Sequence, residues 1–308
     1  MPDSRYSSVA GFVQADYRLL PQLTVQGGWR REEADLRIDS YTTLYRYNRV
    51  AVQGGKLKFQ QNLRNIGLVY APTERFNTFA SYSEGFGMPD VGRVLRSINT
   101  PGTNVESLRS LQPLLTRNSE IGVRYRSPAW EAEASAFQSR SEYGTRVIAV
   151  DGAFQLAREK TAIEGLDASV RYRLNDAHRL GLSYAWTRGR YDSNADGRLD
   201  ARLDGLNIAP NRVIATWSAQ WTPELSTFLQ GQYAFSRNFD EAAKEFSGYA
   251  LFDLGVDYRL AKGKVNLGIA NLFDRQYITY YSQSALIEPA RYFVWRGRTV
   301  TLGYSLDF

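Results

Sequence analysis

The chain has 308 residues, no cysteine and a formal net charge of +6. Without cysteine, disulfide frameworks, thiolate zinc sites and thiolate nucleophiles are excluded. The sequence holds no run of about 20 apolar residues, which excludes a membrane helix but not a transmembrane barrel, whose strands alternate in polarity. Lys and Arg are spread along the chain, so no nucleic-acid-binding surface is predicted.

The N-terminal segment MPDSRYSSVAGFVQAD has no basic stretch followed by an apolar one. It is therefore not read as a signal peptide. If the protein is exported, we expect that a signal was removed or that the chain is part of a longer polypeptide.

Apolar and polar residues alternate with a period of two in about thirteen segments, many near the ten-residue length of a tilted barrel strand. The clearest are residues 168–174, 180–186, 213–221, 252–260, 265–269 and 298–308. This pattern predicts an all-β, antiparallel fold.

The connections between these segments alternate in length. Short ones are expected at 21–22, 72–75, 127–128, 175–176, 223–224 and 262–263, and longer ones at 40–60, 87–117, 193–210, 238–247 and 279–295. Tight turns at one end and long loops at the other are typical of outer-membrane barrels, where they are periplasmic and extracellular respectively.

Aromatic residues precede most of the short turns. They are Tyr17, Tyr70, Tyr125, Tyr172, Trp221 and Tyr258, with Tyr304 and Phe308 at the C-terminus. They predict an aromatic girdle at the periplasmic interface, although a chain with 20 Tyr could show this spacing by chance.

Strand direction gives a further expectation. The last strand runs toward the periplasmic side, and counting back through the connections makes the first strand, about residues 10–20, run the same way. Complete bacterial barrels have an even number of strands, so an odd count of about thirteen predicts further strands upstream.

Several segments resemble TonB-dependent outer-membrane receptors of the ferric-siderophore class. They are GIANLFDRQYITYYS from Gly268, GRTVTLGYSLDF at the C-terminus, NTFASYSEGFGMPD from Asn77, NSEIGVRY from Asn118 and AIEGLDASVRYRL from Ala162. The resemblance extends over essentially the whole chain.

The resemblance implies a transmembrane barrel of about 22 strands, of which residues 1–308 would be the C-terminal part. The plug domain and TonB box of the family have no counterpart here. It also implies a non-enzymatic receptor in the bacterial outer membrane that takes up a ferric siderophore, driven in the intact parent by TonB. The partners would be the siderophore, outer-membrane lipid and lipopolysaccharide, with TonB reached only through the missing N-terminal region.

Aromatic and basic residues in the long loops are the candidate ligand-binding residues. They are Tyr45, Arg46, Tyr47, Arg93, Tyr280, Tyr281, Arg291 and Tyr292. Arginine pairs with the charge of an anionic ferric chelate, and aromatic rings pack against its surface. The alternative is that they form an upper girdle or contact lipopolysaccharide phosphates.

Asp192, Asn194, Asp196 and Asp200 have the alternate spacing of oxygen ligands in the first part of a calcium loop. The twelfth position is Leu203 in place of the bidentate Glu, so a solvated acidic loop is the alternative. No other cofactor is predicted. The single histidine, His178, is expected in a solvated turn, which does not indicate Ser-His catalysis.

Two other functions remain open from the sequence. A passive porin-like channel would share the strand pattern, and conductance would identify it. A soluble β-sandwich binding module would share the alternation, and it would not need detergent for extraction.

Overall fold

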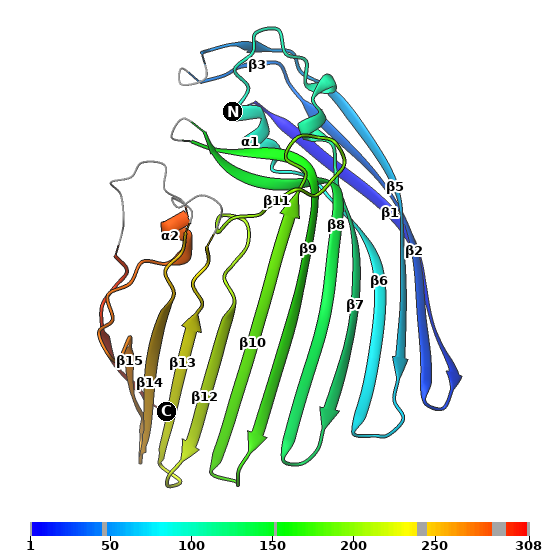
Figure 1. Cartoon of the computed structure of the whole chain (residues 1–308). Coiled ribbons are helices and arrows are strands. Elements are labelled where there is room, and N and C mark those ends of the chain that lie inside the picture. The colour runs from blue at the N-terminus through cyan, green and yellow to red at the C-terminus, as the bar shows by residue number, and fades with distance from the viewer. Residues whose placement is uncertain (1, 45–47, 151–152, 239–244, 285–293, 307–308) are drawn as a thin grey trace.

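A computed structural model describes residues 2–44, 48–150, 153–238, 245–284 and 294–306. Within these residues the chain forms a 14-stranded antiparallel sheet, in which β11 pairs only with β10 and the other 13 strands follow one another in chain order. The sheet curves into an open trough (Figure 1). This confirms the predicted all-β antiparallel fold and the count of about thirteen long strands.

The strands of the main path are β1 (Ser4–Leu20), β2 (Leu23–Ile38), β5 (Gly55–Tyr70), β6 (Phe76–Gly87), β7 (Leu114–Arg126), β8 (Trp130–Val150), β9 (Ala153–Arg173), β10 (His178–Tyr191), β12 (Arg212–Gln220), β13 (Leu225–Ala234), β14 (Tyr249–Leu260), β15 (Gly263–Ala270) and β16 (Thr299–Ser305). The loops add β3 (Tyr41–Thr42), β4 (Ala51–Val52), β11 (Ala201–Arg202), α1 (Val91–Arg96), α2 (Tyr280–Ser284) and the 3₁₀ turns η2 (Val105–Ser107) and η3 (Arg109–Leu111). No helix in the described part of the chain is long and apolar enough to cross a membrane.

Strand register separates the residues into an apolar face and a polar face. Val170 on β9 stands opposite Ala132 on β8 and Leu182 on β10, and all three belong to the apolar face. Leu182 is 48% exposed and Leu302 on β16 is 73% exposed. No second sheet covers this face among the described residues, so the fold is not a β-sandwich.

The two ends of the sheet differ as the connection lengths predict. The short turns gather at one end, and the loops that carry α1, β3, β11 and α2 gather at the other (Figure 1). β1 begins at the loop end, where Ser4 pairs with Ile38. The first strand therefore runs from the loop end to the turn end, in the expected direction.

The aromatic residues near the turn end are exposed on the apolar face. Tyr17, Tyr70, Tyr125, Trp221, Tyr258 and Tyr304 are 67%, 47%, 40%, 50%, 48% and 58% exposed. Trp130 stacks on Tyr172 with ring centroids 4.2 Å apart, which adds a member to this girdle. The predicted member Phe308 lies outside the described residues.

His178 corrects one prediction. It is the first residue of β10 and is half-buried, where a solvated turn was expected. Its ring lies 5.3 Å from that of Trp221 and 6.0 Å from that of Trp217. It is therefore part of the aromatic girdle.

The polarity of the two faces is reversed toward the loop end of β2 and β5. On β5, Leu68 and Ile66 of the apolar face give way to Lys58 and Lys56. On the opposite face, the side chain of Leu36 is 2% exposed, because loop residues cover it. The apolar band of one face thus ends partway along these strands. Beyond it, this face is polar and the opposite face is covered by loops.

Candidate ligand site at the loop end of the sheet

Described residues of loops 39–54 and 88–113 pack into a hydrophobic core on the polar-face side of β2 and β5 (the loop core). Its central residues Leu95, Val105 and Leu111 are 1%, 0% and 0% exposed. Tyr41 donates a hydrogen bond from its hydroxyl to the Leu95 carbonyl at 2.5 Å, and burial raises the pKa of Tyr41 to about 12. The loop core fixes both loops against the sheet.

Arg93 is presented by α1, which the loop core anchors through Val94 and Leu95. Asp90 caps the helix by accepting a hydrogen bond from the Arg93 backbone N–H at 2.9 Å. The Arg93 Nε lies 3.5 Å from Asp90 Oδ2, and a third of the side chain is exposed. Its charge is therefore only loosely paired, and the guanidinium can reach an anionic ligand.

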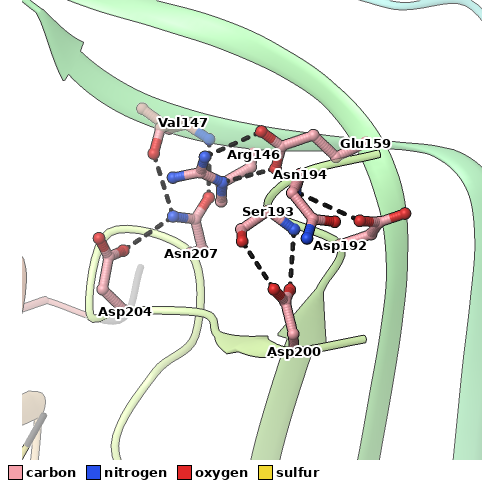
Figure 2. Close-up of polar contacts among 9 residues, drawn as sticks. All are labelled: Arg146, Val147, Glu159, Asp192, Ser193, Asn194, Asp200, Asp204 and Asn207. Carbon is pink, nitrogen blue, oxygen red and sulfur yellow. Dashed lines mark hydrogen bonds and ion pairs between the residues drawn. The ribbon is translucent and has the colours of Figure 1, made fainter. Parts of the chain in front are cut away.

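The hairpin β8–β9 carries a nearly buried ion pair. Arg146 donates to both oxygens of Glu159, from Nε at 2.7 Å and from Nη2 at 2.9 Å (Figure 2). The two side chains are 15% and 20% exposed, and the guanidinium lies 3.9 Å from the centroid of the Tyr191 ring. This bidentate pair stiffens the part of the hairpin that overhangs the sheet.

Two loops are tied to this hairpin. Asn207 in loop 192–211 accepts from the Val147 N–H at 2.7 Å and donates to the Val147 carbonyl at 3.1 Å (Figure 2). On the other side, Arg158 donates from Nη2 to the Gln112 carbonyl at 2.8 Å. The loop end is thus a connected structure, held by side-chain contacts between segments far apart in sequence.

The predicted calcium-loop residues face their own backbone. Asp192 accepts from the N–H groups of Asn194, Asp196 and Gly197, at 3.3, 3.2 and 2.7 Å. Asp200 accepts from the Ser193 N–H at 2.9 Å and from the Ser193 hydroxyl at 2.8 Å. In the described residues no group of three or more His, Cys, Asp or Glu is placed to hold a metal ion. Calcium binding stays a prediction, and these contacts explain the loop's shape without it.

Aromatic rings gather at the loop end of β14. Phe246 makes edge contacts with Tyr249 and Tyr280, at centroid distances of 5.9 and 6.2 Å, and Tyr249 lies 4.6 Å from Tyr277. Burial is the main cause of the raised pKa of Tyr277. Tyr281, on α2, is 52% exposed. Phe246 is 3% exposed and the rings of Tyr249 and Tyr280 meet it edge to face, so the cluster packs this part of the loop end, and Tyr281 is an exposed ring next to it in the sequence.

The structure thus describes three of the eight predicted ligand-binding residues: Arg93, Tyr280 and Tyr281. Tyr45, Arg46, Tyr47, Arg291 and Tyr292 lie outside the described residues. Arg93 sits on loop 88–113, and the two tyrosines sit on α2 (Figure 1). No described contact joins the two groups.

Sequence reasoning missed several residues of the loop end: Arg146, Arg158, Arg237, Phe246, Tyr249 and Tyr277. Arg237 donates to the carbonyls of Ile208 and Thr187, and burial lowers its pKa. Arg146 and Arg158 belong to strands that extend beyond the usual barrel-strand length. The 21-residue length of β8 and β9 is known from the structure and was not predicted.

The polar face carries ion pairs between neighbouring strands. Arg171 contacts Glu131 at 2.9 Å, and Lys264 contacts Asp257 at 2.9 Å. Arg173 lies 4.0 Å from Asp176 in the adjoining turn, and Asp253 accepts from the Asn271 N–H at 2.8 Å. These charged residues of the polar face therefore pair mainly with local partners.

Known proteins of similar sequence include two that are named as receptors. The chain is 24% identical over 347 residues to the ferric aerobactin receptor of Klebsiella pneumoniae, with 100% of this chain and 45% of the receptor covered. It is 22% identical over 336 residues to the rhizobactin receptor of Rhizobium meliloti (strain 1021), with 99% and 44% covered. The chain spans less than half the length of these relatives.

Solved structures share the fold. The copper transporter OprC superposes with a TM-score of 0.84 at 16% identity, covering 99% of this chain and 48% of that one. The ferric yersiniabactin uptake receptor of Yersinia pestis gives 0.78 at 17% identity, covering 99% and 46%. The family model described as "TonB dependent receptor-like, beta-barrel" matches residues 1–272. The chain belongs to the β-barrel family of TonB-dependent receptors.

Proposed function

We propose that the chain forms part of the wall and the ligand-binding mouth of an outer-membrane receptor for a ferric siderophore. In the whole protein, uptake would be driven by TonB. The family match carries the proposal, together with relatives named as receptors for ferric aerobactin and rhizobactin. The exposed apolar face suits contact with lipid, and the polar face suits a water-filled lumen.

The loop end has the chemistry that an anionic ferric chelate needs. Arg93 supplies a loosely paired guanidinium on an anchored helix. Tyr281, which follows Tyr280 of the aromatic cluster on α2, supplies an exposed aromatic ring. Because the loop core holds loops 39–54 and 88–113 in place, less ordering entropy would be lost on binding.

Titration of the detergent-solubilised chain with ferric aerobactin tests the proposal, with tryptophan emission as the readout. We expect saturable quenching, and Arg93→Gln should weaken binding about tenfold or more, because a hydrogen bond to a charged group contributes about 1.5–3 kcal/mol. Arg179→Gln is the matched control, because Arg179 lies at the turn end of β10, at the opposite end of the sheet from Arg93. Unsaturable quenching, or equal affinities for all three proteins, would contradict chelate binding at this mouth.

A passive channel would behave differently in planar bilayers. It would conduct small ions continuously, and ferric aerobactin would not alter the current. The proposal predicts instead that ferric aerobactin binds to the chain, with the affinity found by fluorescence. It makes this prediction whether or not the chain conducts ions.

A further inference from the structure

A short polar turn, residues 271–274, follows β15 directly, and we name it the NLFD turn after its sequence. Its first and last residues, Asn271 and Asp274, both have positive φ angles, of 51° and 53°. Asparagine and aspartate adopt this left-handed conformation more readily than most other residues. The turn therefore begins and ends with a residue that suits its backbone conformation and carries a polar side chain.

Asn271 joins three segments of the chain. Its backbone N–H donates to Asp253 Oδ1 on β14 at 2.8 Å. Its side-chain Oδ1 accepts from the Arg275 N–H at 2.8 Å, and Nδ2 donates to the Arg275 carbonyl at 2.9 Å. Nδ2 also lies 3.5 Å from the Arg296 carbonyl, ahead of β16. Asn271 is only 6% exposed, so water cannot readily replace these bonds.

Two further hydrogen bonds hold the ends of the β15–β16 connection together. Asp274 Oδ1 accepts from the Arg298 N–H at 2.7 Å. The Trp295 N–H donates to the Tyr277 carbonyl at 2.9 Å. The described parts of the connection therefore have a fixed base, in which the NLFD turn and its neighbours face the residues that lead into β16.

The helix α2 lies in this connection, beyond its base (Figure 1). Gln283 Oε1 accepts from the Ser247 N–H at 3.1 Å, and Gln283 Nε2 donates to the Ser247 carbonyl at 3.4 Å. The ring of Tyr280 meets that of the buried Phe246. Tyr281 lies between Tyr280 and Gln283 in sequence and is 52% exposed. The base and these contacts thus fix the backbone that carries Tyr281 and leave its ring accessible.

We propose that Asn271 is a positioning residue for chelate binding that acts through Tyr281. By fixing the base of the connection, Asn271 holds α2 where the Tyr281 ring can pack against a bound chelate. A ring that is held in place before binding loses less conformational entropy when the chelate binds. Because its own side chain is buried among backbone groups, Asn271 would act without touching the ligand. The inference rests on the proposed function for the identity of the ligand.

A double-mutant cycle on the detergent-solubilised chain tests the inference, with ferric aerobactin as the probe. Asn271→Gly tolerates the positive φ and removes the side-chain bonds. We expect this variant and Tyr281→Ala each to weaken binding about tenfold. If Asn271 acts through Tyr281, the double variant should bind no more weakly than Tyr281→Ala alone. Asn175→Gly is the matched control and should leave affinity unchanged, because Asn175 accepts two backbone hydrogen bonds in a turn at the opposite end of the sheet.

Asn271→Asp is a second variant that changes less of the turn. It keeps the acceptor for the Arg275 N–H and the tolerance of positive φ, but it cannot donate to the carbonyls of Arg275 and Arg296. We expect it to weaken binding of ferric aerobactin as Asn271→Gly does. Affinity equal to that of the unaltered chain would contradict a role for the donated hydrogen bonds.

Hydrogen exchange without ligand supplies a readout that is independent of binding. In Asn271→Gly, exchange should be faster at Arg275 and over residues 277–284, and unchanged in the strands β9 and β10. Unchanged exchange at Arg275, or additive losses of affinity in the double variant, would overturn the inference. If the unaltered chain binds no ferric aerobactin, the proposed function fails. Saturable binding that Asn271→Gly leaves unchanged would overturn this inference alone.

Discussion

At the scale of single residues, Asn207 acts as a substitute strand partner for β8. Its amide forms two hydrogen bonds with the backbone of Val147 and donates a third to Asp204 Oδ1 at 2.8 Å. Sequence alone could not identify it, because its partner is 60 residues away and an asparagine in a polar loop is ordinary.

Asn207→Ala should release loop 192–211 from β8. Losing hydrogen bonds to partly buried backbone groups costs about 1–3 kcal/mol, and this cost should appear as local opening. Hydrogen exchange should increase at Val147 and over residues 201–210. Asn194→Ala is the control, because the described side-chain contacts of Asn194 stay within its own loop. Unchanged hydrogen exchange at Val147 would contradict the view that Asn207 holds loop 192–211 against β8.

The Asp200 carboxylate should make the same loop sensitive to acid. Hydrogen bonds from the Ser193 N–H and then the Ser193 hydroxyl lower the pKa of Asp200 below its usual 3.8. A lowered folded-state pKa stabilises the loop above the unfolded pKa, and this stabilisation is lost as pH falls through the folded one. Exchange at Ser193, corrected for intrinsic rates, should therefore increase below about pH 4. Asp200→Ala should show the faster exchange already at neutral pH.

At the scale of elements, strand alternation was readable from the sequence, and loop packing was not. A period of two is local, so residues such as 180–186 reveal their strand directly. The loop core draws on residues between Ala34 and Leu111, and its contacts depend on where the folded loops meet. The start of β5 was predicted wrongly, because the polarity of its two faces is reversed toward the loop end. Residues 55–60 were expected in a loop, but β5 begins at Gly55.

Leu95→Ala should loosen the loop core. Removing a fully buried leucine side chain costs about 2–5 kcal/mol through lost transfer energy and the cavity left behind. Loops 39–54 and 88–113 should become sensitive to protease while the sheet keeps its circular dichroism. Leu44→Ala is the control, since Leu44 is 58% exposed. Equal protease resistance of the two variants would show that the loops are held by other contacts.

At the scale of the whole molecule, the described sheet does not close on itself. β1 pairs only with β2, and β16 pairs only with β15, among the described residues. Unpaired backbone groups in lipid cost several kcal/mol each, and open edges pair readily with other chains. The strand count and direction could be predicted from the sequence. The curvature of the sheet and the packing of the loops at its loop end could not, because both depend on contacts between segments far apart in the chain.

The isolated chain should therefore self-associate in detergent. Size-exclusion chromatography with light scattering should show oligomers or a broad distribution of masses. The reason is that the unpaired backbone groups on the edges of β1 and β16 can form hydrogen bonds with other copies of the chain. A monodisperse, heat-modifiable monomer would show that the two edges find partners within one chain.

The central claim is that one sheet separates lipid from an aqueous lumen, and adjacent residues of β10 test it most directly. The chain has no cysteine, so Leu182→Cys and Ser183→Cys each provide one labelling site, on the apolar and the polar face respectively. With an environment-sensitive fluorophore in lipid vesicles, the Leu182→Cys label should be quenched by lipid-bound nitroxide and the Ser183→Cys label by aqueous iodide. If both labels respond alike to the two quenchers, the sheet is not a membrane wall, and the proposed receptor function fails with it.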